Sequence, residues 1–216
     1  MLDLVSPGNG QAQIPSYLIF AVTFAFAAAI EPGPLQAYLV SRSLALGWRN
    51  TILASFAPLL SDAPIITLTV LVLSRMPPFL VQSLQIIGGI YLLYLAIEAF
   101  KTYRNYSAEK VLQTTGSNTL FKAVLVNLLN PNPYLGWSLV MGPLLLKVWR
   151  EAPVNGVLLL IGFYATMVLS LLGTIMLFSA FRNLGARINH ALIGISGIAL
   201  GGFGLYELWL SVRTFV

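Results

Sequence analysis

Six long apolar runs constrain the fold of this 216-residue chain more than any other feature, and they lie at about residues 16–40, 51–73, 79–100, 119–146, 154–178 and 190–212. A helix that crosses the hydrocarbon of a bilayer needs about 20 predominantly apolar residues, and each run is long enough. Only 9% of the residues are charged, whereas a soluble domain carries about 25%. The runs therefore predict an all-α integral membrane protein with six transmembrane helices.

A polar stretch divides the six runs into two sets of three. Residues 102–118 have the composition of a solvated connector, so we expect one membrane domain made of a first three-span repeat (1–101), a polar cytoplasmic linker (102–118) and a second three-span repeat (119–216).

The two halves share short motifs in the same order. EPGP (31–34) in the first run is matched by NPNP (130–133) in the fourth, and GGIYLLYLAIEAF (88–100) is matched by SGIALGGFGLYEL (196–208). Since each half has three spans, the second copy would cross the membrane in the opposite direction. This is the 3+3 inverted repeat typical of secondary transporters, although glycine- and leucine-rich runs also match by chance.

The basic residues are scattered at the ends of the apolar runs, which is the pattern of a membrane protein and not of a nucleic-acid surface. An excess of Lys and Arg marks the cytoplasmic side, so the count favours a cytoplasmic linker and both termini outside. The richer side holds Arg42, Arg49, Lys101, Arg104, Lys110, Lys122, Arg182 and Arg187, and the poorer side holds Arg75, Lys147, Arg150 and Arg213.

Two carboxylates lie within the apolar runs. Glu31 falls a little past the centre of the first run and Asp62 at the centre of the second. A charge at that depth costs roughly 2.5–3.5 kcal/mol, and such residues are functional candidates by default. We expect a water-filled cavity or protonation to relieve this cost. The alternative is a permanently neutral acid that makes a hydrogen bond between helices.

Prolines surround both acids. Pro32 and Pro34, with Gly33 between them, predict a break in the first helix, because proline lacks an amide donor and clashes with the preceding turn. Pro58 and Pro64 flank Asp62 in the same way. Irregular backbone at membrane depth is tolerated where it is buried in protein or lines a cavity. A simple proline kink is the alternative.

The fourth run carries uncharged amides around its own prolines. Asn127, Asn130 and Asn132 lie beside Pro131 in NLLNPNP. Amide side chains both donate and accept hydrogen bonds, which suits a zwitterion or a hydrated ion. They could equally hold the first and fourth helices together, and the sequence leaves both readings open.

Other polar and aromatic residues predict contacts with the membrane interface. Glu98 and Glu207 lie near the ends of the third and sixth runs, within reach of lipid headgroups, and Glu98 has Lys101 nearby. Trp48, Trp137, Trp149 and Trp209 are typical of interface anchors. Glycines in the third and sixth runs offer small faces for close helix packing, which is compatible with a homodimer.

Several function classes lose support from what the sequence lacks. The chain has no cysteine, which excludes disulfides and thiol redox chemistry. It has no P-loop to bind ATP, and its single histidine cannot form a catalytic or metal cluster. We therefore expect neither a cofactor, nor a resident metal, nor an enzyme.

The motifs together resemble those of the LysE/RhtB-type translocators. The resemblance rests on the PGP of the first run, Asp62, GGIYLLYLA (88–96) and FKAVLVNLLNPNP (121–133), and it covers the whole chain in order. It implies an exporter of amino acids or related metabolites in the bacterial inner membrane, driven by protons or the membrane potential. It also assigns Pro32, Gly33, Pro34, Asp62, Asn130 and Pro131 to the functional core. The stretch FAPLLSDAP (56–64) and Glu31 depart from the family pattern.

These observations lead to one hypothesis with two alternatives. We expect a secondary exporter in which Glu31 and Asp62 exchange protons or bind the cationic group of a small solute, while Asn127, Asn130, Asn132 and the broken helix ends hold its carboxylate. A divalent-cation exporter of the same architecture is the first alternative. A membrane enzyme or non-transporting scaffold is the second.

Overall fold

A computed structural model describes residues 10–71, 78–104, 117–182 and 186–213, and within these ranges the chain forms helices and no strand. The helical elements follow one another as α1 (Gly10–Ile30), α2 (Pro34–Leu46), α3 (Trp48–Thr51), η1 (Ile52–Phe56), α4 (Ala57–Leu71), α5 (Pro78–Arg104), α6 (Ser117–Leu129), α7 (Pro131–Gly136), η3 (Trp137–Met141), α8 (Gly142–Glu151), α9 (Pro153–Phe181) and α10 (Ala186–Arg213). The all-α expectation is confirmed. Most of the expected linker, 105–116, lies outside the described residues.

Membrane character is clear in the long helices. Four helical segments are long and apolar enough to cross a bilayer, namely Trp48–Leu68, Gln82–Arg104, Pro153–Phe181 and Ile188–Arg213. The bent pair α1–α2 makes a fifth if it counts as one span. The expected fourth span instead consists of the short helices α6, α7, η3 and α8. The chain is thus a multi-pass membrane protein, while the number of six spans stays a prediction.

The first helix breaks where the sequence predicts. α1 ends at Ile30, α2 begins at Pro34, and the two are bent by 62°. Proline suits the first helical position because its missing amide would have no partner there. The carbonyls left free at the end of α1 are capped by Gln36, whose Nε2 donates to Ala29 O at 2.8 Å. A side chain of α2 therefore stabilises the end of α1 and fixes the bend.

The fourth run breaks in a similar way. α6 ends at Leu129, and Asn130 is the extended N-cap of α7, whose first residue is Pro131. The Asn130 side chain accepts from the amide of Asn132 at 3.1 Å. The hydroxyl of Tyr134 donates to Leu128 O at 2.9 Å and so caps the end of α6. Both motifs thus produce a helix end followed directly by a helix start.

The second run differs from expectation. α4 runs from Ala57 to Leu71 and continues through Pro64, so Pro64 does not break the helix beside Asp62. The irregular part lies earlier, in the 3₁₀ turn η1, which ends just before Pro58. Asp62 is therefore held by a regular helix, which fixes the direction of its side chain.

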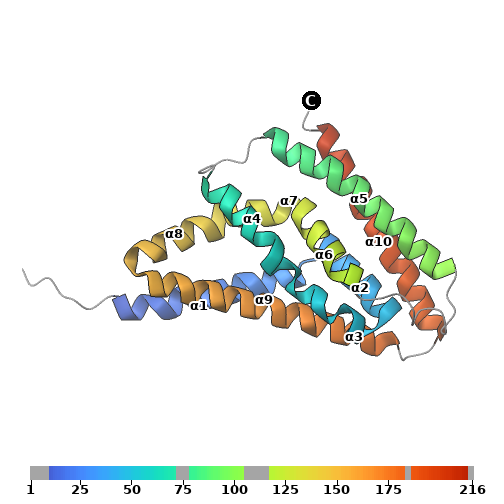
Figure 1. Cartoon of the computed structure of the whole chain (residues 1–216), viewed down its shortest axis with the longest axis horizontal. Helices are drawn as coiled ribbons and strands as arrows, with labels where there is room; N and C mark the ends of the chain where they lie inside the picture. The colour runs from blue at the N-terminus through green and yellow to red at the C-terminus, as the bar shows by residue number, and fades with distance from the viewer. Residues whose placement is uncertain (1–9, 72–77, 105–116, 183–185, 214–216) are drawn as a thin grey trace, which may run out of the picture.

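Two long helix pairs frame the broken helices. Figure 1 shows α1 beside α9 along one edge and α5 beside α10 along another, and α2 contacts both α9 and α10 between them. One face of α9 is buried at helical spacing, with Leu159, Phe163, Met167 and Leu171 among its residues. Large apolar side chains such as Ile161 and Leu169 on its other faces are exposed. Such a helix suits lipid on one side and protein on the other.

Candidate functional site

Asp62 is the centre of the candidate site. Its side chain is only 3% exposed. Trp137 Nε1 donates to Oδ2 at 3.1 Å and the hydroxyl of Tyr164 donates to the same oxygen at 3.3 Å. Asn127 Nδ2 donates to Oδ1 at 3.2 Å. All three donors are neutral, so the carboxylate is hydrogen-bonded while no residue in the described part of the chain supplies a counter-charge to it.

A second layer of contacts orients Asn127. Its amide nitrogen also donates to Ser61 Oγ at 2.7 Å, and the Ser61 hydroxyl in turn donates to Ala57 O at 3.0 Å. Ser61 and Asn127 are buried. The amide can donate from Nδ2 only if its oxygen points away from Asp62, so this network fixes which way the Asn127 side chain faces.

A cavity of about 300 Å³ adjoins Asp62. This volume lies at the lower end of the range for small-molecule sites, about 300–1,000 Å³. Its lining residues are Phe24, Ala28, Glu31, Gly33, Leu35, Gln36, Pro58, Asp62, Asn127, Asn130, Asn132, Pro133, Leu135, Gly136, Trp137, Met141, Phe163 and Met167. Both helix breaks thus border one space.

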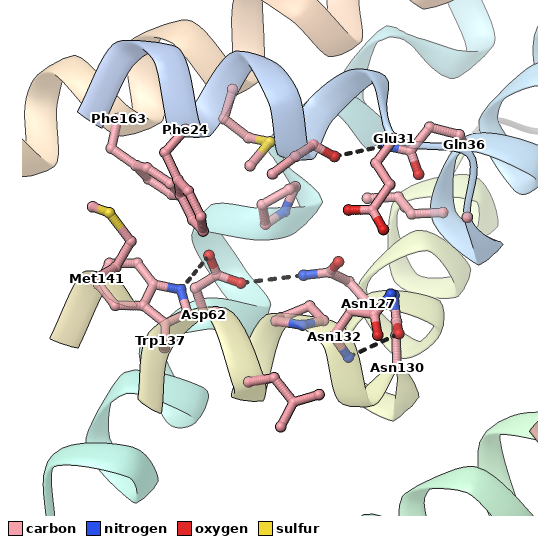
Figure 2. A pocket seen from close by; sticks show the side chains of 18 residues that line it. Phe24, Glu31, Gln36, Asp62, Asn127, Asn130, Asn132, Trp137, Met141 and Phe163 are labelled. Carbon is pink, nitrogen blue, oxygen red and sulfur yellow. Dashed lines mark hydrogen bonds between the residues drawn. The ribbon is translucent and has the colours of Figure 1, made fainter. Parts of the chain in front are cut away.

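The cavity has an aromatic end. Trp137 and Phe163 meet edge to face with ring centroids 5.4 Å apart, and Phe24 lies 6.5 Å from Phe163. Figure 2 shows these rings and Met141 on one side of Asp62. Aromatic faces bind apolar groups and also attract cations. This end therefore suits either a hydrocarbon group or an ammonium group close to Asp62.

The opposite end is polar. Glu31 lies in the break between α1 and α2, and its side chain points into the cavity (Figure 2). Asn130 and Asn132 approach from the break between α6 and α7. Unlike Asp62, Glu31 is exposed. The two acids therefore share one space but differ in contact with solvent.

The structure brings most of the expected site residues together. Six of them border the cavity, namely Glu31, Gly33, Asp62, Asn127, Asn130 and Asn132. Pro32, Pro34 and Pro131 do not line it and instead belong to the helix breaks. Their part in function stays a prediction.

Sequence reasoning missed the aromatic partners of Asp62. The expectation that Trp137 anchors at the membrane interface is wrong, because its ring is 3% exposed and its N–H binds Asp62. Trp137 begins η3, a π-helical turn, and such turns are frequent at functional sites. The signal in the sequence was limited, because a buried tryptophan needs a hydrogen-bond acceptor but the sequence does not distinguish it from a tryptophan at the membrane interface. Tyr164 carried no comparable signal.

Glu98 pairs within the protein, with cations that the sequence did not indicate. Its carboxylate accepts from Arg42 Nη2 at 2.5 Å and from Lys122 Nζ, instead of pairing with Lys101. Arg42 Nε also donates to the hydroxyl of Tyr38 at 3.3 Å. Glu98 therefore joins α2, α5 and α6, which belong to the two predicted halves.

Comparison with known proteins identifies one family. A family model described as LysE type translocator matches residues 26–210. Searches of curated proteins and of solved structures found no match for the chain. The matched range includes both helix breaks, Asp62 and every residue that borders the cavity except Phe24.

Proposed function

This chain belongs to the LysE type translocator family and is therefore a membrane transporter, and on that premise we propose that it is a secondary transporter which exports amino acids or related small metabolites. The observation that carries the proposal is the position of Asp62, a carboxylate with neutral donors only, in a cavity bordered by two helix breaks.

Asp62 suits the cationic group of the solute. Its carboxylate is held in place by three donors and keeps its charge for a cation from outside the protein. The neighbouring faces of Trp137 and Phe163 favour an ammonium group as well as an apolar side chain. An amino acid carries both groups, and so fits this end of the cavity.

The polar end suits the solute's carboxylate. Leu35 and Gln36 lie in the first turn of α2 and border the cavity, and Gly33 supplies no side-chain cap for the amides of that turn. A helix N-terminus attracts anions. The amides of Asn130 and Asn132 add donors. Glu31 opposes an anion here unless it is protonated, which links solute binding to proton exchange.

Alternating access would proceed through the two helix breaks. In a 3+3 inverted repeat of six spans, the break in the first span and the break in the fourth span would lie at equivalent positions in the two halves. Export would draw on the proton gradient or the membrane potential. The matching chemistry of EPGP and NPNP, each a helix end followed by a proline-started helix, supports this arrangement.

We place the protein in the bacterial inner membrane with both termini outside. Arg42 and Lys122, which the basic-residue count assigns to the cytoplasmic side, meet at one carboxylate. The side chain of Arg182, which the count assigns to the same side, lies close to Gly47 at the end of α2. Its Nη1 would be 2.7 Å from a Cβ atom added to that glycine. Three basic residues from α2, α6 and the end of α9 therefore gather at one end of the molecule, which supports the assignment.

The proposal is tested by efflux from proteoliposomes. Vesicles holding a panel of labelled amino acids are compared with and without an imposed pH gradient, for wild type and Asp62→Asn. We expect gradient-dependent efflux of one class of amino acid that is lost in the variant. If no amino acid moves, the assay is repeated with divalent cations. Their movement would replace the proposal with the cation alternative, and no movement at all would reject export.

A further inference from the structure

Glu207 is a buried acid that the proposed solute site does not use. It lies on α10 and is 7% exposed, contrary to the expectation that it reaches lipid headgroups. Its Oε2 has no hydrogen-bond donor among the described residues. A buried carboxylate that lacks partners costs several kcal/mol. Burial of this acid costs free energy, and a bound ligand would offset that cost.

A cavity of about 10 Å³ borders Glu207, which is about the smallest volume that holds one water molecule. Its lining includes Pro34, the first residue of α2, and Asn130, the residue between α6 and α7. The space thus lies against both helix breaks. Its size suits a single small ion or water and excludes an organic solute.

The two helix breaks separate this cavity from the larger one. Asn130 borders both cavities, while Gly33 borders the larger and its neighbour Pro34 borders the smaller. A ligand at Glu207 would therefore touch the same backbone segments as a solute beside Asp62, from the opposite side. The breaks form the physical connection between the two sites.

The residues that border the small cavity supply oxygen acceptors, and Tyr91 and Asn130 can also supply donors. Leu129 borders it, and the carbonyl oxygen of Leu129 would lie 2.6 Å from a Cβ placed on Gly88, another lining residue. That carbonyl has no amide donor four residues on, because residue 133 is proline. A carboxylate and a carbonyl oxygen beside one small space attract a positive charge. Tyr91 on α5 is the other titratable side chain among the lining residues, and those from α2 and α6 are uncharged.

We propose that Glu207 and the Leu129 carbonyl form a site for one monovalent cation, a proton or a sodium ion, behind the helix breaks. A proton on Glu207 would be donated to an acceptor oxygen, and a sodium ion would be coordinated by both groups. One carboxylate neutralises one positive charge, which disfavours a divalent ion. Coupling of this cation to solute export rests on the proposed function, whereas its binding at Glu207 does not.

The test measures charge movement in the absence of any solute. The full-length protein in liposomes is adsorbed to a solid-supported membrane, and the buffer is switched to sodium chloride from choline chloride, or to a lower pH. We expect a transient current in wild type with one of the two switches, and that switch identifies the cation. The current should be lost in Glu207→Gln and kept in Glu151→Gln, which removes an exposed acid outside both cavities.

Three further variants keep the result interpretable. A pH switch also acts on Asp62, so Asp62→Asn is compared with the double variant Asp62→Asn/Glu207→Gln, and the current that remains in the first should vanish in the second. Glu207→Asp keeps the charge on a shorter side chain and should respond at a higher cation concentration. This response would show that loss in Glu207→Gln is not misfolding.

Three outcomes overturn the inference: a sodium current that persists in Glu207→Gln or a pH-driven current that persists in the double variant, a current already abolished by Asp62→Asn, or no current with either switch in folded wild type. If the Glu207-dependent current is present but no solute is exported in the efflux assay, the proposed function fails and the cation site stands.

Discussion

Asp62 and Glu98 are both carboxylates inside the helical bundle, and they differ in the charge of their partners. Glu98 accepts from two cations, Arg42 and Lys122. Asp62 accepts from the neutral groups of Trp137, Tyr164 and Asn127, and no cation among the described residues pairs with it. An acid whose counter-charges belong to the protein is neutralised in place and holds helices together. An acid with neutral donors has no counter-charge from those partners and is open to a proton or a cationic ligand.

The two acids also differ in the size of the cavity beside them. Asp62 borders a cavity of about 300 Å³, whereas the space beside Arg42, at the Glu98 cluster, has about 10 Å³. Two acids that look alike in the sequence thus have different surroundings, and we propose that Asp62 serves binding while Glu98 serves structure. The following variants test this division, in order of expected effect.

Asp62→Asn should have the largest effect on transport. In this variant the cationic group of the solute would lose its charged partner, which costs about 3 kcal/mol, so efflux should fall about 100-fold. The amide keeps the size of the side chain, and the thermal stability of the purified protein should change little. Efflux close to wild type would show that Asp62 is not the cation-binding group.

Glu98→Gln should act on stability more than on transport. Arg42 and Lys122 would lose their shared counter-charge, and because Glu98 is partly exposed we expect a loss of about 1–2 kcal/mol, between the values for surface and buried pairs. Thermal unfolding in detergent measures it. A double-mutant cycle with Lys122→Gln should give a smaller loss than the sum of the single variants. The division of roles fails if Glu98→Gln abolishes efflux without loss of stability.

Trp137→Phe removes one donor to Asp62 and keeps most of the aromatic surface. A hydrogen bond to a charged group is worth about 1.5 kcal/mol at the lower end of its range, so solute affinity should fall at least about tenfold. The matched control is Trp149→Phe, an exposed tryptophan outside the cavity, which should leave affinity unchanged. Equal effects of both variants would remove Trp137 from the site.

Glu31→Gln should have the smallest effect. Glu31 is exposed, so water screens its interaction with the solute, and surface charge pairs are worth about 0.2–1 kcal/mol. Efflux should fall about two- to fivefold, with the larger loss under an imposed pH gradient if Glu31 exchanges protons. A loss equal to that of Asp62→Asn would make Glu31 the main carrier of the cation.

The helix breaks and the cavity acids could be predicted because each depends on local chemistry. Pro34 and Pro131 lack an amide donor wherever the rest of the chain lies, and both begin a helix after a break. An acid in an apolar run is equally conspicuous, and Glu31 and Asp62 do share a cavity. Pro64 shows the limit of the rule, since α4 continues through it.

Partners distant in the sequence could not be predicted in the same way. Trp137 and Tyr164 lie 75 and 102 residues from Asp62. A tryptophan in an apolar run has the same local signature at the membrane interface and in a protein core, and the rotation of its helix decides between them. The same holds for Glu98, whose cations come from α2 and α6.

By itself the sequence determined that this chain is a multi-pass helical membrane protein with breaks at EPGP and NPNP, because hydropathy and the missing amide of proline are properties of single residues and short runs. Only the tertiary structure decided that Trp137 and Tyr164 bind Asp62, that Glu98 is neutralised by Arg42 and Lys122, and that Glu207 is buried behind the breaks. These contacts depend on how whole helices pack and rotate, and a few ångströms of displacement would change every partner.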